Sequence, residues 1–319
     1  MKILFTMLAI SVSINAYSQL VEIQGYALDT LKNHNFVSIT INDTLNKYIE
    51  YRKTDDEAIS YHKIQKEFST TTKKDGSFYI KARPTDSLFF SSNPLGLPKY
   101  ITQSYAVEDL LSRDSIHIQL IPEKCIEYVE CADENPELYV FVGEVIEVKE
   151  IEEAYYCNRI PFDSKYKAKL KILDNVYGSF SKDTIVFNAY DHYGKPNFAN
   201  FKNVLIYVAK HCDTLYHQKY QFSPAYQIEG KWASTFNNSR KKNNDLYRQK
   251  AKPMKFDESV FFVVNNQVSD SLINVRLKKP YFSRKDSVFK PLYGNYVEDI
   301  FEIMKQTYFK ESSYFKNQK

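Results

Sequence analysis

The predicted architecture depends most on one segment in the middle of the chain, Leu138-Tyr139-Val140-Phe141-Val142-Gly143-Glu144-Val145-Ile146-Glu147-Val148. Its β-branched and aromatic residues are typical of a long strand. Gly143 in its interior indicates a bulge or bend, which a strand needs to turn the corner of a small barrel. Four further strands are predicted after it, at residues 166–176, 183–188, 204–209 and 221–228. Five strands favour a closed or nearly closed barrel.

Two of these strands have contrasting patterns. In residues 166–176, Ala168, Leu170 and Ile172 alternate with Lys167, Lys169 and Lys171. Since side chains of a strand alternate between its faces, this strand is expected to have one face in water. Residues 204–209 are apolar throughout, so that strand is expected in the centre of the sheet.

The order of these features resembles the netrin-like domain shared with tissue inhibitors of metalloproteases. The resemblance lies in Val140–Val145, Tyr166–Leu170, Tyr177-Gly178, Leu205–Ala209 and the nearby Cys212. It implies an OB-type barrel over residues 123–236. The inhibitors use a Cys-x-Cys at the start of the mature chain, whereas a whole domain precedes Cys125 and Cys131 here. Residues 193–198 also contain no cysteine before the fourth strand, so the family's disulfide pattern does not transfer.

Residues 19–122 are predicted to form a separate domain of short strands. Strand patterns occur at residues 21–28, 37–41, 68–72, 77–82, 87–91 and 116–120. Asp75-Gly76, between two of these patterns, is a strong hairpin signal. Seven or so short strands separated by turns predict an antiparallel, seven-stranded sandwich.

This domain resembles the carboxypeptidase regulatory-like domain, a prealbumin-like sandwich. The resemblance lies in the strand with Gly25, in Val37–Ile41, in Thr72–Phe78, in Leu88–Ser91 before Gly96, and in Ile118-Gln119-Leu120. It implies a non-catalytic module that stiffens, spaces or docks other modules. A charged insertion, residues 42–66, departs from the family. Its Asp55, Asp56 and Glu57 lack the spacing of calcium ligands, so a solvated loop is expected.

Residues 237–319 are predicted to contain a polar linker at 237–252, strands at 259–264 and 272–277, and a helix at 295–310. Tyr296, Val297, Ile300, Phe301, Met304 and Tyr308 form one apolar face of that helix. We expect this face to pack on the barrel, with capture of a partner as the alternative.

The N-terminus is predicted to be a signal peptide, residues 1–18. Met1-Lys2 precede an apolar run at residues 3–14, and Ala16-Tyr17-Ser18 have small residues at the positions that a signal peptidase reads. The run is shorter than the ~20 residues of a membrane helix. The expected location is therefore the periplasm, the cell surface or the medium, with no stable membrane span. The formal net charge of +4 is mild, so nucleic acid is not an expected partner.

The four cysteines, Cys125, Cys131, Cys157 and Cys212, are expected to form disulfides. An even number of cysteines in an exported protein favours bridges over thiols. All three pairings stay open, and any bridge is expected to belong to the second domain. A zinc site is the alternative, but the usual CxxC spacing is absent.

Common catalytic motifs are absent from the sequence. The chain has 8 glycines, of which the closest two are Gly178 and Gly194, so GxGxxG, Walker A and GxSxG motifs are excluded. No HExxH occurs either. Glu144, Asp191-His192 and His211-Cys212-Asp213 remain as candidate catalytic groups. Neighbours in sequence say little, because catalytic partners meet in space. No cofactor and no metal are expected.

These observations favour an exported, non-catalytic binding or scaffold protein of the cell envelope. The expected partner is an envelope protein, with a glycan as the second choice, since the 26 tyrosines and an OB-type barrel are compatible with a sugar-binding face. One alternative is an inhibitor or regulator of an envelope peptidase that acts through the barrel. A second alternative is a secreted hydrolase with a convergent site.

Overall fold

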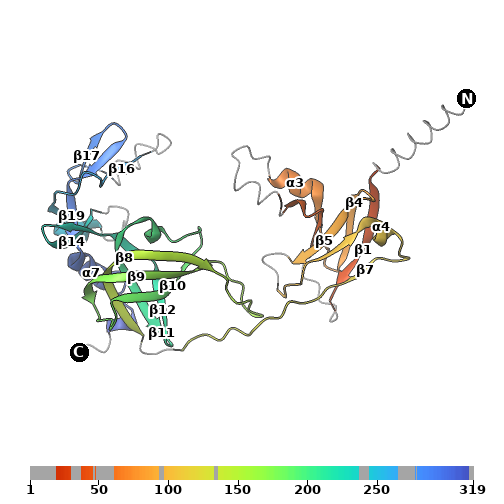
Figure 1. Cartoon of the computed structure of the whole chain (residues 1–319), viewed down its shortest axis with the longest axis horizontal. Coiled ribbons are helices and arrows are strands. Elements are labelled where there is room, and N and C mark those ends of the chain that lie inside the picture. The colour runs from red at the N-terminus through yellow and green to blue at the C-terminus, as the bar shows by residue number, and fades with distance from the viewer. Residues whose placement is uncertain are drawn as a thin grey trace, which may run out of the picture. The chain divides into compact units, whose positions relative to one another are not determined.

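The computed structural model describes residues 19–29, 37–45, 47, 61–92, 97–132, 136–236, 244–264, 277 and 279–315. The predicted signal peptide, the acidic residues Asp55–Glu57 and most of the strand predicted at 272–277 lie outside these residues. The chain is mostly β and divides into two compact units (Figure 1). The first unit extends to Tyr128 and also includes Ala154–Ile160, and the second comprises Val129–Glu153 and Pro161–Lys319.

The first unit is a sandwich of two sheets. One sheet has the order β4-β1-β7 and the other β3-β2-β5-β6. The strands are β1 (Val21–Leu28), β2 (Val37–Ile41), β3 (Ser69–Thr71), β4 (Ser77–Ala82), β5 (Ser87–Ser92), β6 (Gln103–Ala106) and β7 (His117–Gln119). Ile23, Ile39, Phe78, Leu88 and Phe90 lie in the core between the sheets. The predicted seven-stranded sandwich is confirmed, except that β1 and β7 run parallel rather than antiparallel.

The hairpin predicted at Asp75-Gly76 is wrong in one respect. The turn forms, because the amide of Gly76 donates to the carbonyl of Lys73 at 2.9 Å. Its two arms, however, pair in different sheets, β3 with β2 and β4 with β1. The hydroxyl of the buried Thr72 accepts a hydrogen bond from the amide of Val37 at 2.9 Å, which holds the first arm in the sheet of β2. Local turn chemistry therefore specified the reversal but not the pairing.

Helices α3 (Tyr61–Phe68) and α4 (Val107–Leu111) belong to this unit as well. Helix α3 occupies part of the segment that was predicted to be a solvated loop. Strand β6 was not predicted. His117, which alternates with Ile116 and Ile118, is exposed and stacks on Tyr26 at 5.6 Å between ring centroids.

The second unit is built on a closed barrel with the order β10-β12-β11-β8-β9. Its strands are β8 (Glu137–Ile151), β9 (Ser164–Tyr177), β10 (Thr184–Asp191), β11 (Asn203–His211) and β12 (Thr214–Pro224). Strands β10 and β12 meet in parallel, at Asn188 and Tyr216, and the other pairs are antiparallel. Going round the barrel, the first strand is followed by the second, third, fifth and fourth. This Greek-key order is that of an OB-type barrel.

Bulges shape the barrel where the sequence predicted a bend and also elsewhere. The register of β8 against β9 shifts between Val142 and Gly143, and at two further places. A Cβ atom on Gly143 would lie 2.9 Å from the ring of Phe141, so the close approach requires glycine. Strand β12 is bulged as well, because its register against β11 shifts between Ile206 and Val208.

The fifth barrel strand begins at Thr214, seven residues earlier than predicted. Cys212 and Asp213 form a two-residue turn in which both have a positive φ, 42° and 62°. Glycine and asparagine usually occupy such turns, so Cys-Asp gave no hairpin signal. Residues 226–228, which were assigned to the fifth strand, form β13 (Tyr226–Ile228) in another sheet, paired with β14 (Lys231–Thr235).

The C-terminal segments cover one outer face of the barrel. Helix α7 (Val297–Gln306) buries Val297, Ile300, Phe301, Ile303 and Met304, and these pack in one cluster with outward-facing residues of β8 and β11. The predicted helix and its packing on the barrel are confirmed, although Tyr308 is 52% exposed and Phe309 is buried instead.

The remaining elements of this unit are short. They are η1 (Asn197–Asn200), α5 (Asn244–Lys250), β15 (Lys252–Pro253), β16 (Phe262–Val263), β17 (Phe282–Lys285), β18 (Val288–Pro291), β19 (Tyr293–Tyr296) and η2 (Ser313–Phe315). Helix α5 lies in the segment that was predicted to be a linker. The strand predicted at residues 259–264 is reduced to β16.

Candidate binding face of the barrel

Both disulfides form, and their pairing resolves what the sequence left open. Cys125 is bonded to Cys157, and Cys131 is bonded to Cys212. All four sulfur atoms are therefore used, and no thiolate remains to bind zinc. The expectation that every bridge lies in the second domain is wrong. Cys125 and Cys157 both belong to the first unit, because the β8–β9 loop contributes Ala154–Ile160 to that unit.

Further contacts build this loop into the first unit. The amide of Ile126 donates to the carbonyl of Tyr155 at 3.0 Å, and the amide of Cys157 donates to the carbonyl of Ile126 at 2.9 Å. The guanidinium of Arg159 lies 4.2 Å from the ring centroid of Tyr128. The chain therefore passes between the units three times, after Tyr128, after Glu153 and after Ile160.

Two of the candidate catalytic groups lie on barrel strands and on the turn between β11 and β12. Cys212 is disulfide-bonded and is no nucleophile. The neighbouring His211 has its Nε2 3.2 Å from the hydroxyl of Tyr314, which also accepts a hydrogen bond from Gln218. Glu144 lies in β8, opposite Lys171 of β9 and Asn203 of β11.

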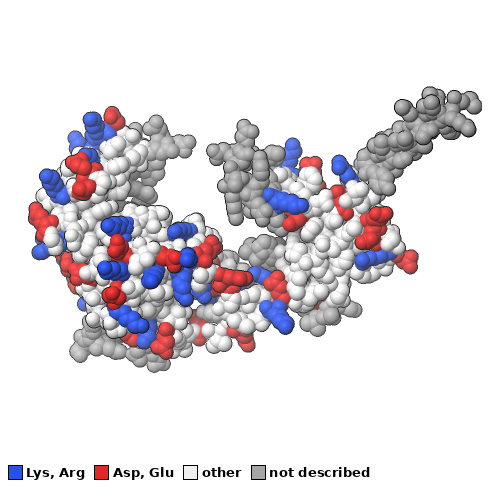
Figure 2. Space-filling view, in the orientation of Figure 1, with Lys and Arg blue, Asp and Glu red and all other residues white. Residues whose placement is uncertain are grey.

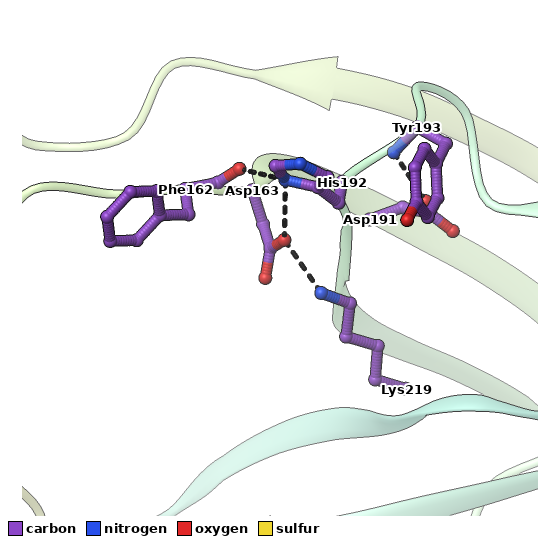
Figure 3. Close-up of polar contacts among 6 residues, drawn as sticks. All are labelled: Phe162, Asp163, Asp191, His192, Tyr193 and Lys219. Carbon is purple, nitrogen blue, oxygen red and sulfur yellow. Dashed lines mark hydrogen bonds and ion pairs between the residues drawn. The ribbon is translucent and has the colours of Figure 1, made fainter. Parts of the chain in front are cut away.

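The third candidate, Asp191-His192, lies at the end of β10 (Figure 3). His192 Nδ1 donates to the carbonyl of Phe162 at 2.7 Å and lies 3.7 Å from the carboxylate of Asp163. Asp163 also binds Lys219 Nζ at 2.7 Å. The carboxylate of Asp191 instead accepts a hydrogen bond from the amide of Tyr193 at 2.9 Å. The partner of His192 is thus Asp163 rather than its neighbour in sequence.

Asp163, His192 and Lys219, here called the end cluster, come from three strand ends or bulges. Burial by itself lowers the pKa of Lys219, but its hydrogen bonds to Asp163 and Tyr220 outweigh burial and raise this pKa. Lys219 therefore stays charged. Sequence reasoning missed both Asp163 and Lys219, because the contact depends on the bulge in β12 that places Lys219 beside the start of β9. No local pattern indicates that bulge.

A row of lysines leads away from the end cluster along β9. Lys165, Lys167, Lys169 and Lys171 alternate with the buried Tyr166, Ala168 and Leu170, so all four face outward. At ~3.3–3.4 Å per residue, successive lysines are about 7 Å apart along the strand. None of the four is in an ion pair with any acidic residue that the structure describes. This set is called the lysine row below.

The strands beside the lysine row add little negative charge. On β10, Thr184, Val186, Asn188 and Tyr190 stand opposite the four lysines. On β8, Glu144 and Glu147 stand opposite Lys171 and Lys169, but Glu147 is ion-paired with Lys149 at 2.7 Å. Lys149 itself stands opposite Lys167, and like charges in opposite positions are destabilising. In Figure 2, Lys and Arg side chains, with several carboxylates between them, lie over the part of the barrel where Figure 1 draws β8, β9 and β10.

One aromatic pair completes the face. Tyr190 of β10 stands opposite Lys165, and its ring stacks with Tyr216 of β12 at 6.3 Å between centroids and 26° between planes. The ammonium of Lys165 lies 5.9 Å from the centroid of Tyr190. Beyond this pair, at the end cluster, Phe162 and Tyr193 are 70% and 88% exposed. The outer face of β9, β10 and β12 is therefore cationic, with its exposed rings gathered at one end.

Comparison with known proteins adds no relative to this description: no family model, no curated protein and no solved structure matches the chain. Within the described residues, no helix has the length and apolar character needed to cross a membrane. The same residues contain no cluster of three or more His, Cys, Asp or Glu side chains arranged to hold a metal ion.

Proposed function

We propose that this chain is an exported binding protein of the cell envelope whose barrel binds an acidic partner. The lysine row supports the proposal: four outward-facing cations on one strand, without ion-paired partners among the described residues. Unpaired like charges raise the free energy of the free protein, and an acidic ligand relieves that repulsion. In OB-type barrels, the face of the second and third strands is a frequent binding surface, and β9 and β10 hold these positions. That analogy is at the level of the fold.

The two disulfides fit an oxidising compartment, and export stays part of the proposal. The netrin-like and carboxypeptidase regulatory-like resemblances are proposals as well. Inhibition of a peptidase and hydrolysis stay predictions, because no contact among the described residues favours either.

The proposal is tested by calorimetric titration of residues 19–319 with two carboxylate polymers, polygalacturonate and poly-L-glutamate, at low salt. We expect binding that weakens with salt, with a slope of log K against log salt near −3, at ~0.7 per neutralised contact for four contacts. Replacing all four lysines of the row by glutamine is expected to weaken binding by about 5- to 1,000-fold, since four exposed pairs contribute ~1–4 kcal/mol together.

The matched control removes the same charge elsewhere in the second unit, at the exposed Lys252, Lys255, Lys279 and Lys310. It is expected to bind nearly as well as the parent chain. Equal losses in both variants would show a nonspecific effect of net charge, and absence of binding to either polymer would refute the proposal.

A further inference from the structure

We infer that the acidic partner is an acidic polysaccharide, with one of its sugar rings packed at the Tyr190–Tyr216 pair. This inference rests on the proposed function, because the lysine row supplies the charge complementarity. It adds a ligand class, and it depends on residues that the lysine row does not include.

The aromatic pair has the position that a charged sugar requires. Tyr190 and Lys165 occupy opposite positions in the β9–β10 register, and the ammonium lies 5.9 Å from the ring centroid. A pyranose presents an apolar C–H face, which packs on an aromatic ring, and a uronic acid also bears a carboxylate at the rim of its ring. One uronate residue on Tyr190 would therefore reach both the ring and Lys165. Both tyrosines are partly buried, and each keeps an exposed portion on this surface.

The rest of the β10 row argues against two other anionic polymers. Thr184, Val186 and Asn188 continue the row from Tyr190, and none is aromatic. Proteins that bind single-stranded nucleic acid stack successive bases on successive aromatic side chains, and this row has one ring position. An acidic polypeptide, in turn, gains nothing specific from a paired tyrosine platform. A linear chain with a charge on each sugar matches a row of cations that leads to one ring platform.

The end cluster extends the same surface with groups suited to hydroxyls. Since His192 Nδ1 donates to the carbonyl of Phe162, its Nε2 is an acceptor in the neutral ring, and the side chain is 52% exposed. The carboxylate of Asp163 is held by Lys219 at 2.7 Å and retains further acceptor capacity. Phe162 and Tyr193 flank these groups as exposed rings (Figure 3). An imidazole and a carboxylate between aromatic rings suit the hydroxyl-rich end of a sugar chain.

The test compares polygalacturonate, poly-L-glutamate, neutral dextran and an oligothymidylate as titrants of residues 19–319. We expect polygalacturonate to bind most tightly and dextran not to bind. The double variant Tyr190→Ala with Tyr216→Ala is expected to bind polygalacturonate about tenfold more weakly and to bind poly-L-glutamate with unchanged affinity. Tyr190→Phe with Tyr216→Phe keeps the rings and is expected to retain most of the affinity. Tyr308→Ala is the control, because this exposed tyrosine lies outside the lysine row, the aromatic pair and the end cluster.

Because the double alanine variant also loses packing, a second measurement uses the unaltered chain. Saturation-transfer NMR from aromatic protein protons to oligogalacturonate is expected to give the strongest signal on the C–H protons of the sugar ring. If poly-L-glutamate bound as tightly as polygalacturonate and the tyrosine variants had no effect, the inference of a polysaccharide would be overturned. The proposed function would still stand. Tighter binding of oligothymidylate would overturn it in favour of nucleic acid. Failure of both carboxylate polymers to bind would end both proposals together.

Discussion

Strands β9 and β11 belong to the same barrel, but their outer faces have different surroundings. The outward residues of β11 include Leu205, Tyr207 and Ala209, and all three are buried beneath the C-terminal segments. The outward residues in the first half of β9 are the lysine row, which those segments leave in contact with solvent, whereas Tyr177 at the end of β9 packs on α7. Both strands turn equally apolar residues inward. The difference shows that the barrel interior is specified by every strand, whereas each outer face is specified by what covers it.

Substitutions in the face that the C-terminal segments cover are expected to have the larger effect on the free energy of unfolding. Phe301 of α7 is buried and stacks on Tyr177 of β9 at 5.0 Å between centroids. Phe301→Ala is expected to lower the free energy of unfolding by about 3–5 kcal/mol, because it removes a buried ring and leaves a cavity. Urea denaturation measures this value. Tyr308→Ala, at the exposed end of the same segment, is expected to change it by less than about 0.5 kcal/mol. Similar losses in the two variants would contradict the packing of α7 on the barrel.

The interior of the barrel lies between these two faces, and it contains a histidine, His217, that makes stability depend on pH. His217 packs among Phe187 and Phe198, and burial lowers its pKa to about 4, although the hydrogen bond to the carbonyl of Gln221 opposes this. The unfolded chain takes up this proton near the ordinary histidine pKa of 6.5, whereas the folded chain does so only near pH 4. Stability is therefore expected to be full above pH ~6.5 and to fall by roughly 3 kcal/mol as the pH drops towards 4.

Unfolding in urea between pH 4 and pH 7.5 measures this loss. In His217→Gln, which keeps a donor for the carbonyl of Gln221, the part of the loss between pH 6.5 and 4 is expected to shrink. An unchanged pH profile in this variant would assign the loss to other groups.

The exposed face is expected to be the least sensitive to substitution. Replacing the four lysines of the row by glutamine is expected to leave the free energy of unfolding within about 0.5 kcal/mol per site, with a small gain at low salt as repulsion is removed. Thermal unfolding at two salt concentrations measures both values. A loss above this range would mean that the lysine row stabilises the barrel, and the face would then lose its main argument for binding.

The sequence predicted more of the strands than of their partners. The alternation in residues 166–176 predicted a strand with one wet face, and the run at 204–209 predicted a central strand; both are confirmed. The Asp-Gly turn was predicted from the same kind of local signal, yet its arms enter different sheets, because pairing depends on residues such as Val37 that lie far away in the sequence. The fifth barrel strand was misplaced because Cys-Asp is an uncommon pair in a tight turn.

The candidate site divides in the same way. Its lysines were visible in the sequence as an alternating pattern. The end cluster was not predicted, since it joins Asp163 and Lys219, which are far apart in the chain, through a bulge.

By itself, the sequence determined the class of structure, because alternation and turn residues act within a few positions: a β-rich chain, a sandwich before a barrel, an amphipathic C-terminal helix and four bridged cysteines. Only the tertiary structure decided which cysteines pair, which sheet each arm of a turn enters, and which outer face of the barrel the C-terminal segments bury. Those outcomes depend on contacts between residues distant in sequence, and the free energy of burying an apolar face is gained only when its cover is in place.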